Sequence, residues 1–222
     1  MIAIGRYSLN VLIVYAHPEP KSFDADMRDR AVQILTREGH AVVVSDLYAM
    51  RFKAQLDADD FTDPADEIYF NLQKEQLHAA ETGTFAADIL AEQRKLLWSN
   101  MLILQFPLWW YSVPAIMKGW IDRVLAYGFA YGQGRNLKGR RAMLVMTTGG
   151  QVQPFTMEKQ NILSAMLDHV QRGTLHFCGF DVLPPFAVYG AANANADQRE
   201  QFMVQYTQLL RGLHLIDPIA YG

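Results

Sequence analysis

Apolar runs of strand length alternate with segments of helical character along this chain, and no other feature constrains its fold more. Residues 10–16 (NVLIVYA) form a continuous apolar run after Asn10, as expected of a central parallel strand that is covered on both faces. Further strands are expected at residues 41–44, 100–105, 141–147 and 181–188. Five strands with intervening helices predict a doubly wound α/β sheet, and right-handed crossovers place helices on both of its faces.

The segments between these runs have helical spacing of apolar residues and recognisable end signals. Helices are expected at residues 23–38, 86–99, 114–124, 155–174 and 197–213. Residues 47–85 are polar and lack a clean period, so we interpret them as a long excursion with short helical pieces. Ordered loops of that length usually serve a function or an interface. We expect one domain that spans residues 1–222 and carries this excursion.

Composition excludes several classes of function. The net charge is −3 and half of the residues are hydrophobic, so the chain has an ample core and no basic footprint for nucleic acid. The single Cys178 cannot close an internal disulfide, and the histidines show no metal-ligand spacing. We find no secretory signal and no apolar run of membrane-spanning length, so the simplest location is the cytoplasm.

An unusual aromatic loop follows the third predicted strand, in the sequence QFPLWWYSVPAIMKGW of residues 105–120. In open α/β sheets, ligands bind at the carboxyl ends of the strands. Trp109, Trp110 and Tyr111 cannot all be buried on one side of such a loop, and a cleft with aromatic walls suits a flat, conjugated ligand such as a flavin. The alternative is an ordinary aromatic minicore under the loop, and this stretch alone leaves both readings open.

Two other loops should lie at the same edge of the sheet. After the first strand, Ser22 or Asp24 can cap the following helix, whose N-terminus is suited to a phosphate, and His17 can add a hydrogen bond. After the fourth strand, Gly149 and Gly150 let the backbone approach a ligand closely. Simple capping and a tight turn are the alternatives. The usual dinucleotide and P-loop motifs are absent, because the glycines of residues 132–139 do not follow a strand.

Taken together, several segments resemble the NAD(P)H:quinone oxidoreductases of flavodoxin-like fold. The segments that carry the resemblance are residues 12–23 (LIVYAHPEPKSF), 45–52 (SDLYAMRF), 105–124 (QFPLWWYSVPAIMKGWIDRV), 129–131 (FAY), 147–150 (TTGG) and 175–180 (LHFCGF). They run in family order over nearly the whole chain. The resemblance implies a five-stranded flavodoxin-like sheet, a noncovalent flavin, most often FAD and less often FMN, and a homodimer with active sites at the interface. It also implies ping-pong hydride transfer from NAD(P)H through the flavin to a quinone.

The resemblance also assigns roles to individual positions. Residues resembling those that hold the flavin diphosphate and ribityl chain are His17, Ser22, Phe23 and Asp24. Residues matching the loop beside the isoalloxazine ring are Pro107, Leu108, Trp109 and Trp110, and those matching the turn at the flavin edge are Thr147, Thr148, Gly149 and Gly150. Asp122 and Arg199 match positions at the adenosine end of FAD, which favours FAD over FMN. Residues assigned to the substrate pocket are Trp110, Tyr111, Phe155 and Tyr131, the last as a tyrosine contributed by the partner subunit.

The chain departs from the family pattern at two places. Where the mammalian enzymes have a Tyr and a His that stabilise charge at the flavin, this chain has Phe155 and Asn161, which cannot donate from a hydroxyl or take up a proton. Backbone N–H groups of Gly149 and Gly150 are expected to serve instead as catalytic donors to the reduced flavin. The family also commonly has Asn at the position of Asp24, where a carboxylate would repel a phosphate unless it caps the helix.

Other functions remain compatible with the same fold. One is an electron carrier without enzyme activity, although such carriers are usually smaller and more acidic than this chain. Another is an ancillary or regulatory flavoprotein subunit of a membrane transporter. A third is a reductase of nitro or azo compounds, which differs only in the acceptor. The predicted activity is that of an NAD(P)H dehydrogenase (quinone).

Overall fold

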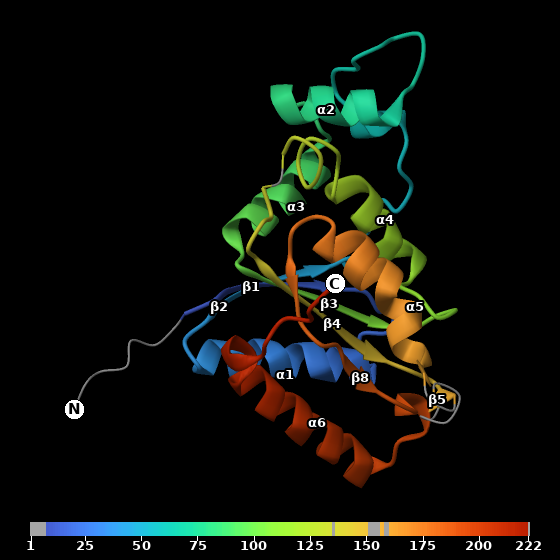
Figure 1. Cartoon of the computed structure of the whole chain (residues 1–222). Coiled ribbons are helices and arrows are strands. Elements are labelled where there is room, and N and C mark those ends of the chain that lie inside the picture. The colour runs from blue at the N-terminus through green and yellow to red at the C-terminus, as the bar shows by residue number, and fades with distance from the viewer. Residues whose placement is uncertain (1–7, 135, 151–155, 158–159, 222) are drawn as a thin grey trace, which may run out of the picture.

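The computed structural model describes residues 8–134, 136–150, 156–157 and 160–221. A central sheet has helices on both sides (Figure 1). Its strands are β1 (Asn10–Tyr15), β2 (Ala41–Asp46), β3 (Met101–Pro107), β4 (Arg141–Thr147), β7 (Asp181–Val182) and β8 (Phe186–Val188). Their order is β2-β1-β3-β4-β7, with β8 also paired to β4, and every pairing is parallel. The predicted doubly wound α/β fold is therefore confirmed.

Helices cover the sheet from two sides. The pair on one face is α1 (Phe23–Arg37) and α6 (Ala196–Arg211), and those on the other are α3 (Ala87–Trp98), α4 (Ala115–Val124) and α5 (Ile162–Val170) (Figure 1). Successive residues of β1 point to opposite faces, so Val11 and Ile13 enter the core with α1 and α6, whereas Leu12 and Val14 enter the other core. Two buried faces explain why this strand is apolar at every position.

The fifth predicted strand is interrupted. Residues 181–188 form β7 and β8, each paired with β4, instead of one continuous strand. Pro184 and Pro185 lie between the two pieces, and a proline has no N–H to donate to a neighbouring strand. The parallel direction of this strand agrees with the predicted sheet, but its continuity was not predicted correctly.

The helix expected at residues 155–174 begins later than predicted. Thr156–Met157 (β5) and Gln160–Asn161 (β6) pair as short antiparallel strands, and α5 starts at Ile162. Thr and Asn are weak helix formers, which favours a late start. The helical path then continues as a π-helical segment, Gln171–His176. Phe155 lies outside the described residues.

The excursion has short helical pieces, as its sequence predicts. It contains a short 3₁₀ turn (Ala58–Asp60) and α2 (Leu72–Thr82), which protrudes from the rest of the molecule (Figure 1). The α2 helix begins at the cap Asn71, whose side chain accepts the N–H of Lys74, and ends at Gly83 in the left-handed region. Other short 3₁₀ turns are Ala191–Asn193 and Leu213–Leu215.

A buried guanidinium fastens the excursion to α4. Arg123 donates to the carboxylate of Asp60 at 2.9 and 3.1 Å and to the carbonyl of Lys53 at 2.8 Å. It also donates to Asp88, in the first turn of α3, at 2.7 Å. Nearby, a Cβ on Gly119 would lie 2.1 Å from the carbonyl oxygen of Ala54, so only glycine allows this close approach.

None of the helices in the described part of the chain combines the length and apolar character that crossing a bilayer requires. The same residues contain no cluster of three or more His, Cys, Asp or Glu side chains able to hold a metal ion.

Candidate functional site

Three loops converge at the carboxyl edge of the sheet because β1, β3 and β4 are adjacent, parallel and in register there. They enclose a cleft of about 260 Å³. Its lining residues after β1 are His17, Ser22, Phe23 and Asp24. Those at the end of β3 and beyond it are Pro107, Leu108 and Trp109, and those at the end of β4 and beyond it are Thr147, Thr148 and Gly149. Most of the predicted cofactor-binding residues thus lie in one place.

The loop after β1 is held by its own side chains. Ser22 caps α1, since its Oγ accepts the N–H of Ala25 at 3.1 Å. His17 Nδ1 accepts the N–H of Glu19 at 3.0 Å, so Nε2 carries the proton when the ring is neutral. Of the two expected caps, Ser22 therefore serves and Asp24 does not. The start of α1 lies at the wall of the cleft, where its dipole favours an anion.

The Asp24 carboxyl is buried, with only 3% of its surface exposed. Its Oδ2 accepts a short 2.6 Å hydrogen bond from the Thr147 hydroxyl, whereas Oδ1 has no hydrogen-bond partner among the described residues. Burial raises the pKa of Asp24, against the opposing effects of the Thr147 hydrogen bond and of His17. The cleft therefore contains an acid in which burial favours the neutral form.

The aromatic loop is exposed, not buried. Trp109 and Ser112 exchange backbone hydrogen bonds at 3.0 and 3.2 Å, and this tight turn holds Trp110 and Tyr111 at φ of 48° and 60°. Such angles are uncommon for side chains of this size. The Trp110 side chain is 95% exposed and Tyr111 is half exposed, which excludes the aromatic minicore. Only Trp109 of the three lines the cleft.

The turn after β4 combines a fixed hydroxyl with open backbone. The Thr148 hydroxyl donates to the carbonyl of Gly150 at 2.6 Å and accepts the N–H of Gly190 at 3.3 Å. At Gly149 a Cβ would meet nothing within 4 Å, so the backbone there faces open space beside the cleft. A flat ligand can approach the chain closely at this point.

Sequence reasoning missed the loop after β8. Ala191 and Ala192 line the cleft, and the N–H of Ala191 donates to the carbonyl of Thr148 at 3.0 Å. Because both side chains are methyl groups, nothing in their chemistry indicates a binding site. Their only signal in the sequence is the run of small residues directly after the last strand.

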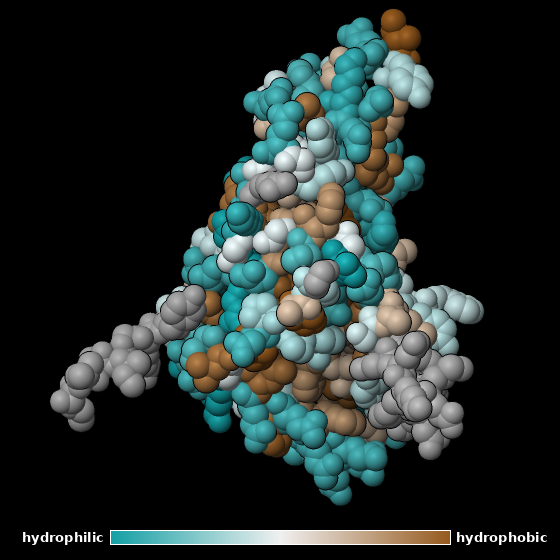
Figure 2. All heavy atoms as spheres, in the orientation of Figure 1, coloured by the Kyte–Doolittle hydropathy of each residue, from teal (hydrophilic) through white to brown (hydrophobic). Residues whose placement is uncertain are grey.

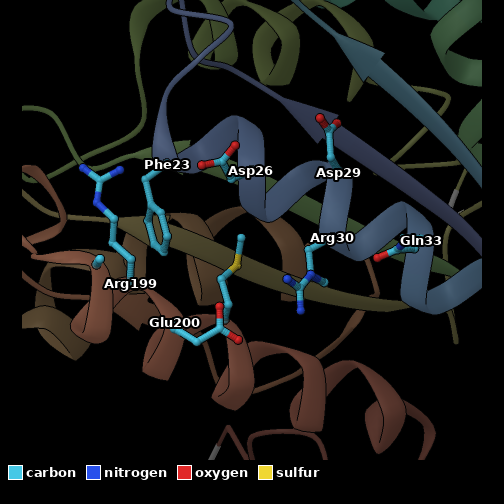
Figure 3. Close-up of a pocket in the computed structure, with 9 residues that line it drawn as sticks. Phe23, Asp26, Asp29, Arg30, Gln33, Arg199 and Glu200 are labelled. Atoms are coloured by element: carbon cyan, nitrogen blue, oxygen red, sulfur yellow. The ribbon is translucent and has the colours of Figure 1, made fainter.

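Arg199 of α6 closes one end of the cleft. Its guanidinium lies 5.4 Å from the centre of the Phe23 ring, and its Nε donates to the carbonyl of Ala194 at 3.2 Å. The same two side chains also line a neighbouring hollow of about 600 Å³ between α1 and α6. Figure 3 shows them at one end of this hollow, with Arg30 and Gln33 farther along α1.

The predicted residues Asp122 and Tyr131 lie in a different part of the molecule from this cleft. Asp122 and Tyr131 line a separate cavity of about 490 Å³ between α2, α4 and the π-helical segment, and Asp122 pairs with Lys118. In that cavity the Tyr131 and Phe177 rings are 5.5 Å apart. Within one chain, the structure therefore does not bring Asp122 together with Arg199. The Asn161 side chain, like Phe155, lies outside the described part of the site.

Comparisons with known proteins agree with this architecture. A family model described as a flavodoxin-like fold matches residues 9–210. Ribosyldihydronicotinamide dehydrogenase (quinone) from Homo sapiens is 42% identical over 217 residues, which are 94% of each chain. NAD(P)H dehydrogenase (quinone) 1 from Rattus norvegicus is 37% identical over 95% of this chain and 80% of its own length. A crystal structure assigned as a quinone reductase, from Klebsiella pneumoniae, superposes with a TM-score of 0.92 at 40% identity, covering 96% of this chain and 88% of its own.

Proposed function

The chain belongs to the flavodoxin-like family that contains these quinone reductases, and we propose that it is a flavin-dependent NAD(P)H:quinone oxidoreductase. One observation carries the proposal beyond family membership. The loops after β1, β3 and β4 form a single cleft that has a helix N-terminus at its wall and exposed indole rings in one of its loops.

The residues present fit a flavin. The start of α1 and Arg199 provide positive potential for a phosphate, and the open backbone at Gly149 leaves room for a ring edge. The centres of the Trp109 ring and of the His17 ring, which lies in the loop after β1, are 6.4 Å apart. A conjugated ring system and an anionic chain are the two chemical parts that such a cleft can hold.

A flavin bound there would supply the two-electron chemistry that links NAD(P)H to a quinone. The chain supplies binding, orientation and electrostatics. We infer that backbone N–H groups at Gly149 and Gly150 stabilise a developing anion, since donors that are oriented by the fold need no reorganisation during the reaction. Trp109, Trp110 and Tyr111 offer exposed rings against which a flat donor or acceptor can stack. If donor and acceptor occupy one place in turn, kinetics are ping-pong.

We infer FAD as the cofactor in preference to FMN. Arg199 and Phe23 join the cleft to the hollow between α1 and α6, so the site continues past the phosphate-binding end. That extra space is large enough for more than a phosphate. The position of Asp122 no longer supports this choice within one chain, which leaves Arg199 as its basis.

We further infer a homodimer in which each copy completes the other's site. The middle of the excursion carries exposed apolar residues, with Ile68 96% exposed, and Figure 2 shows hydrophobic side chains among polar ones at the protruding end of the molecule. Phe177, 66% exposed, adds an aromatic surface beside Tyr131. Burial of such residues against a second copy would remove apolar surface from water.

The test of this function begins with the purified protein. We expect it to be yellow, to release FAD on heating, and to be bleached by NADH or NADPH without oxygen and recoloured by a quinone. Ribosyldihydronicotinamide belongs among the donors, since it is named in one relative. The Gly149→Trp variant should fold but lose flavin, because a Cβ there has no neighbour within 4 Å and the residue lines the cleft.

Three outcomes separate the alternatives. Wild-type protein that takes up neither FAD nor FMN contradicts the proposed function. A bound flavin that no dihydronicotinamide reduces indicates an electron carrier. Reduction by NAD(P)H followed by slow transfer to quinones and fast transfer to nitro or azo compounds keeps the chemistry and changes the acceptor.

A further inference from the structure

Asp24 is an acidic side chain at a place where an anion should bind. It is the second residue of α1, at the wall of the cleft and next to the capping Ser22. A helix N-terminus stabilises one negative charge well, and a carboxylate there competes with a phosphate for the same potential. The role that a carboxylate could have as a cap is taken by Ser22.

The partners of Asp24 suit a neutral acid better than a carboxylate. Oδ2 accepts from the Thr147 hydroxyl at 2.6 Å, and Oδ1 is buried without a hydrogen-bond partner in the described part of the chain. No Lys or Arg is among the groups that act on its ionisation. A buried carboxylate with one hydrogen-bond donor and no Lys or Arg partner is destabilised by the loss of its hydration, and protonation removes that penalty.

The groups that face Asp24 come from every element packed around it. They are Tyr15 of β1, His17 of the following loop, Thr147 of β4 and Tyr206 of α6. Arg199 of α6 lines the same cleft. Burial raises the pKa of Tyr15 to about 12 and raises that of Tyr206 further, so both hydroxyls stay neutral. His17 is the group of this set that can carry positive charge. His17 and the Thr147 hydrogen bond favour the Asp24 carboxylate, and burial opposes them with the larger effect.

We propose that Asp24 takes part in flavin binding as a neutral carboxylic acid, and that its ionisation weakens the hold on a phosphate-bearing flavin. This inference rests on the proposed function and deepens it, since it names a group that makes cofactor retention depend on pH. With the Thr147 hydroxyl donating to Oδ2, the proton of the neutral acid belongs on Oδ1, the atom without a partner.

The sign of the pH dependence follows from linkage. Below the raised pKa, Asp24 is already neutral, and flavin binding exchanges no proton at this group. Above it, the carboxylate must take up one proton before the phosphate binds without repulsion. Affinity for FAD should therefore fall with rising pH, by up to about tenfold per pH unit for one linked proton.

The experiment is a fluorescence titration of flavin-stripped full-length protein from about pH 5 to about pH 9. FAD is the main probe, because FMN carries a phosphate monoester that itself ionises near pH ~6. We expect FAD affinity of the wild type to decline through this range and that of Asp24→Asn to stay level, since an amide cannot ionise. Riboflavin, which has no phosphate, should show little pH dependence with either protein.

A second readout does not need the cofactor. Infrared difference spectra should show a protonated carboxyl band in the wild type that Asp24→Asn lacks, and the band should vanish over the pH range in which FAD affinity falls. Thr147→Val removes the donor that favours ionisation, so it should move both transitions to higher pH. Circular dichroism checks that each variant folds.

The outcomes distinguish this inference from the function on which it rests. Equal pH dependence of FAD binding in the wild type and Asp24→Asn overturns the inference alone, as does a carboxyl band that vanishes in a different pH range. A chain that takes up no flavin at any pH overturns the proposed function and the inference with it.

Discussion

Two buried aspartates show how the same residue type is used in different ways on the two faces of the sheet. Asp60 is matched by the guanidinium of Arg123 and by the ammonium group of Lys53 at 3.0 Å. Asp24 has one hydroxyl donor and no ion-pair partner among the described residues. Removal of a partner therefore has opposite consequences. Loss of Arg123 would leave the buried Asp60 carboxylate with less compensation for its charge. Loss of the Thr147 hydroxyl would make the neutral form of Asp24 still more favourable.

The Arg123→Met variant tests the first case. Methionine fills much of the same volume but leaves the Asp60 carboxylate buried with only Lys53 to compensate it. We expect a loss of about 3–5 kcal/mol in the free energy of unfolding, measured by urea denaturation. The control is Lys74→Met, which removes an exposed ion pair with Asp66 and should cost less than about 1 kcal/mol. Similar losses in both variants would contradict a structural role for the buried cluster.

Single residues differ in how far a sequence alone reveals their position. The convergence of His17, Trp109 and Thr147 could be predicted because parallel neighbouring strands end at one edge. The partnership of Arg123 with Asp60 could not, since 63 residues separate them and nothing local to either pairs them. Ala191 was missed because a methyl group carries no chemical signal for a polar cleft.

At the scale of elements, the apolar period locates strands and helices, and local backbone chemistry decides where they break. The strand at residues 141–147 was predicted to the residue, and α1 to within one residue at its end. The break between β7 and β8 is visible afterwards as Pro184 and Pro185, which remove two donors in succession. Short helical pieces were predicted within the excursion and α2 is one of them, but its bounds could not be predicted because the segment lacks a clean apolar period.

The contact between α4 and the excursion gives an element-scale prediction. Gly119→Ala places a methyl group 2.1 Å from the Ala54 carbonyl oxygen, so the excursion must move away from α4. We expect a loss of about 1–3 kcal/mol in the free energy of unfolding. Hydrogen exchange should become faster than in the wild type, and the increase should be larger in residues 52–60 than in the rest of the chain. The control is Gly212→Ala, whose Cβ has its nearest contact at 3.7 Å and should leave stability unchanged or slightly higher. Unchanged exchange in residues 52–60 would show that the close contact does not anchor this segment.

At the scale of the whole molecule, the predicted site residues divide between two cavities. His17, Trp109 and Gly149 line the cleft at the edge of the sheet, whereas Tyr131 lines the cavity beside Phe177. One chain cannot use both sets at one reaction centre unless a second copy brings its Tyr131 cavity to the first copy's cleft. In a two-fold dimer this exchange is reciprocal, so both sites are completed together.

Mixed dimers test whether the site is shared. Tyr131→Ala should impair the half that a chain gives to its partner, and Gly149→Trp should block that chain's own cleft, so each pure variant should lose most quinone reductase activity. A dimer of one Tyr131→Ala chain and one Gly149→Trp chain keeps one complete site, formed by the open cleft of the first and the intact Tyr131 of the second. Such dimers, isolated with two different affinity tags, should have about half of the wild-type turnover.

Dimers of one wild-type and one Gly149→Trp chain provide the reference, because they also keep one complete site. Mixed dimers as inactive as the two parents would place Tyr131 in the site of its own chain, and a monomeric wild type in sedimentation would remove the shared site altogether.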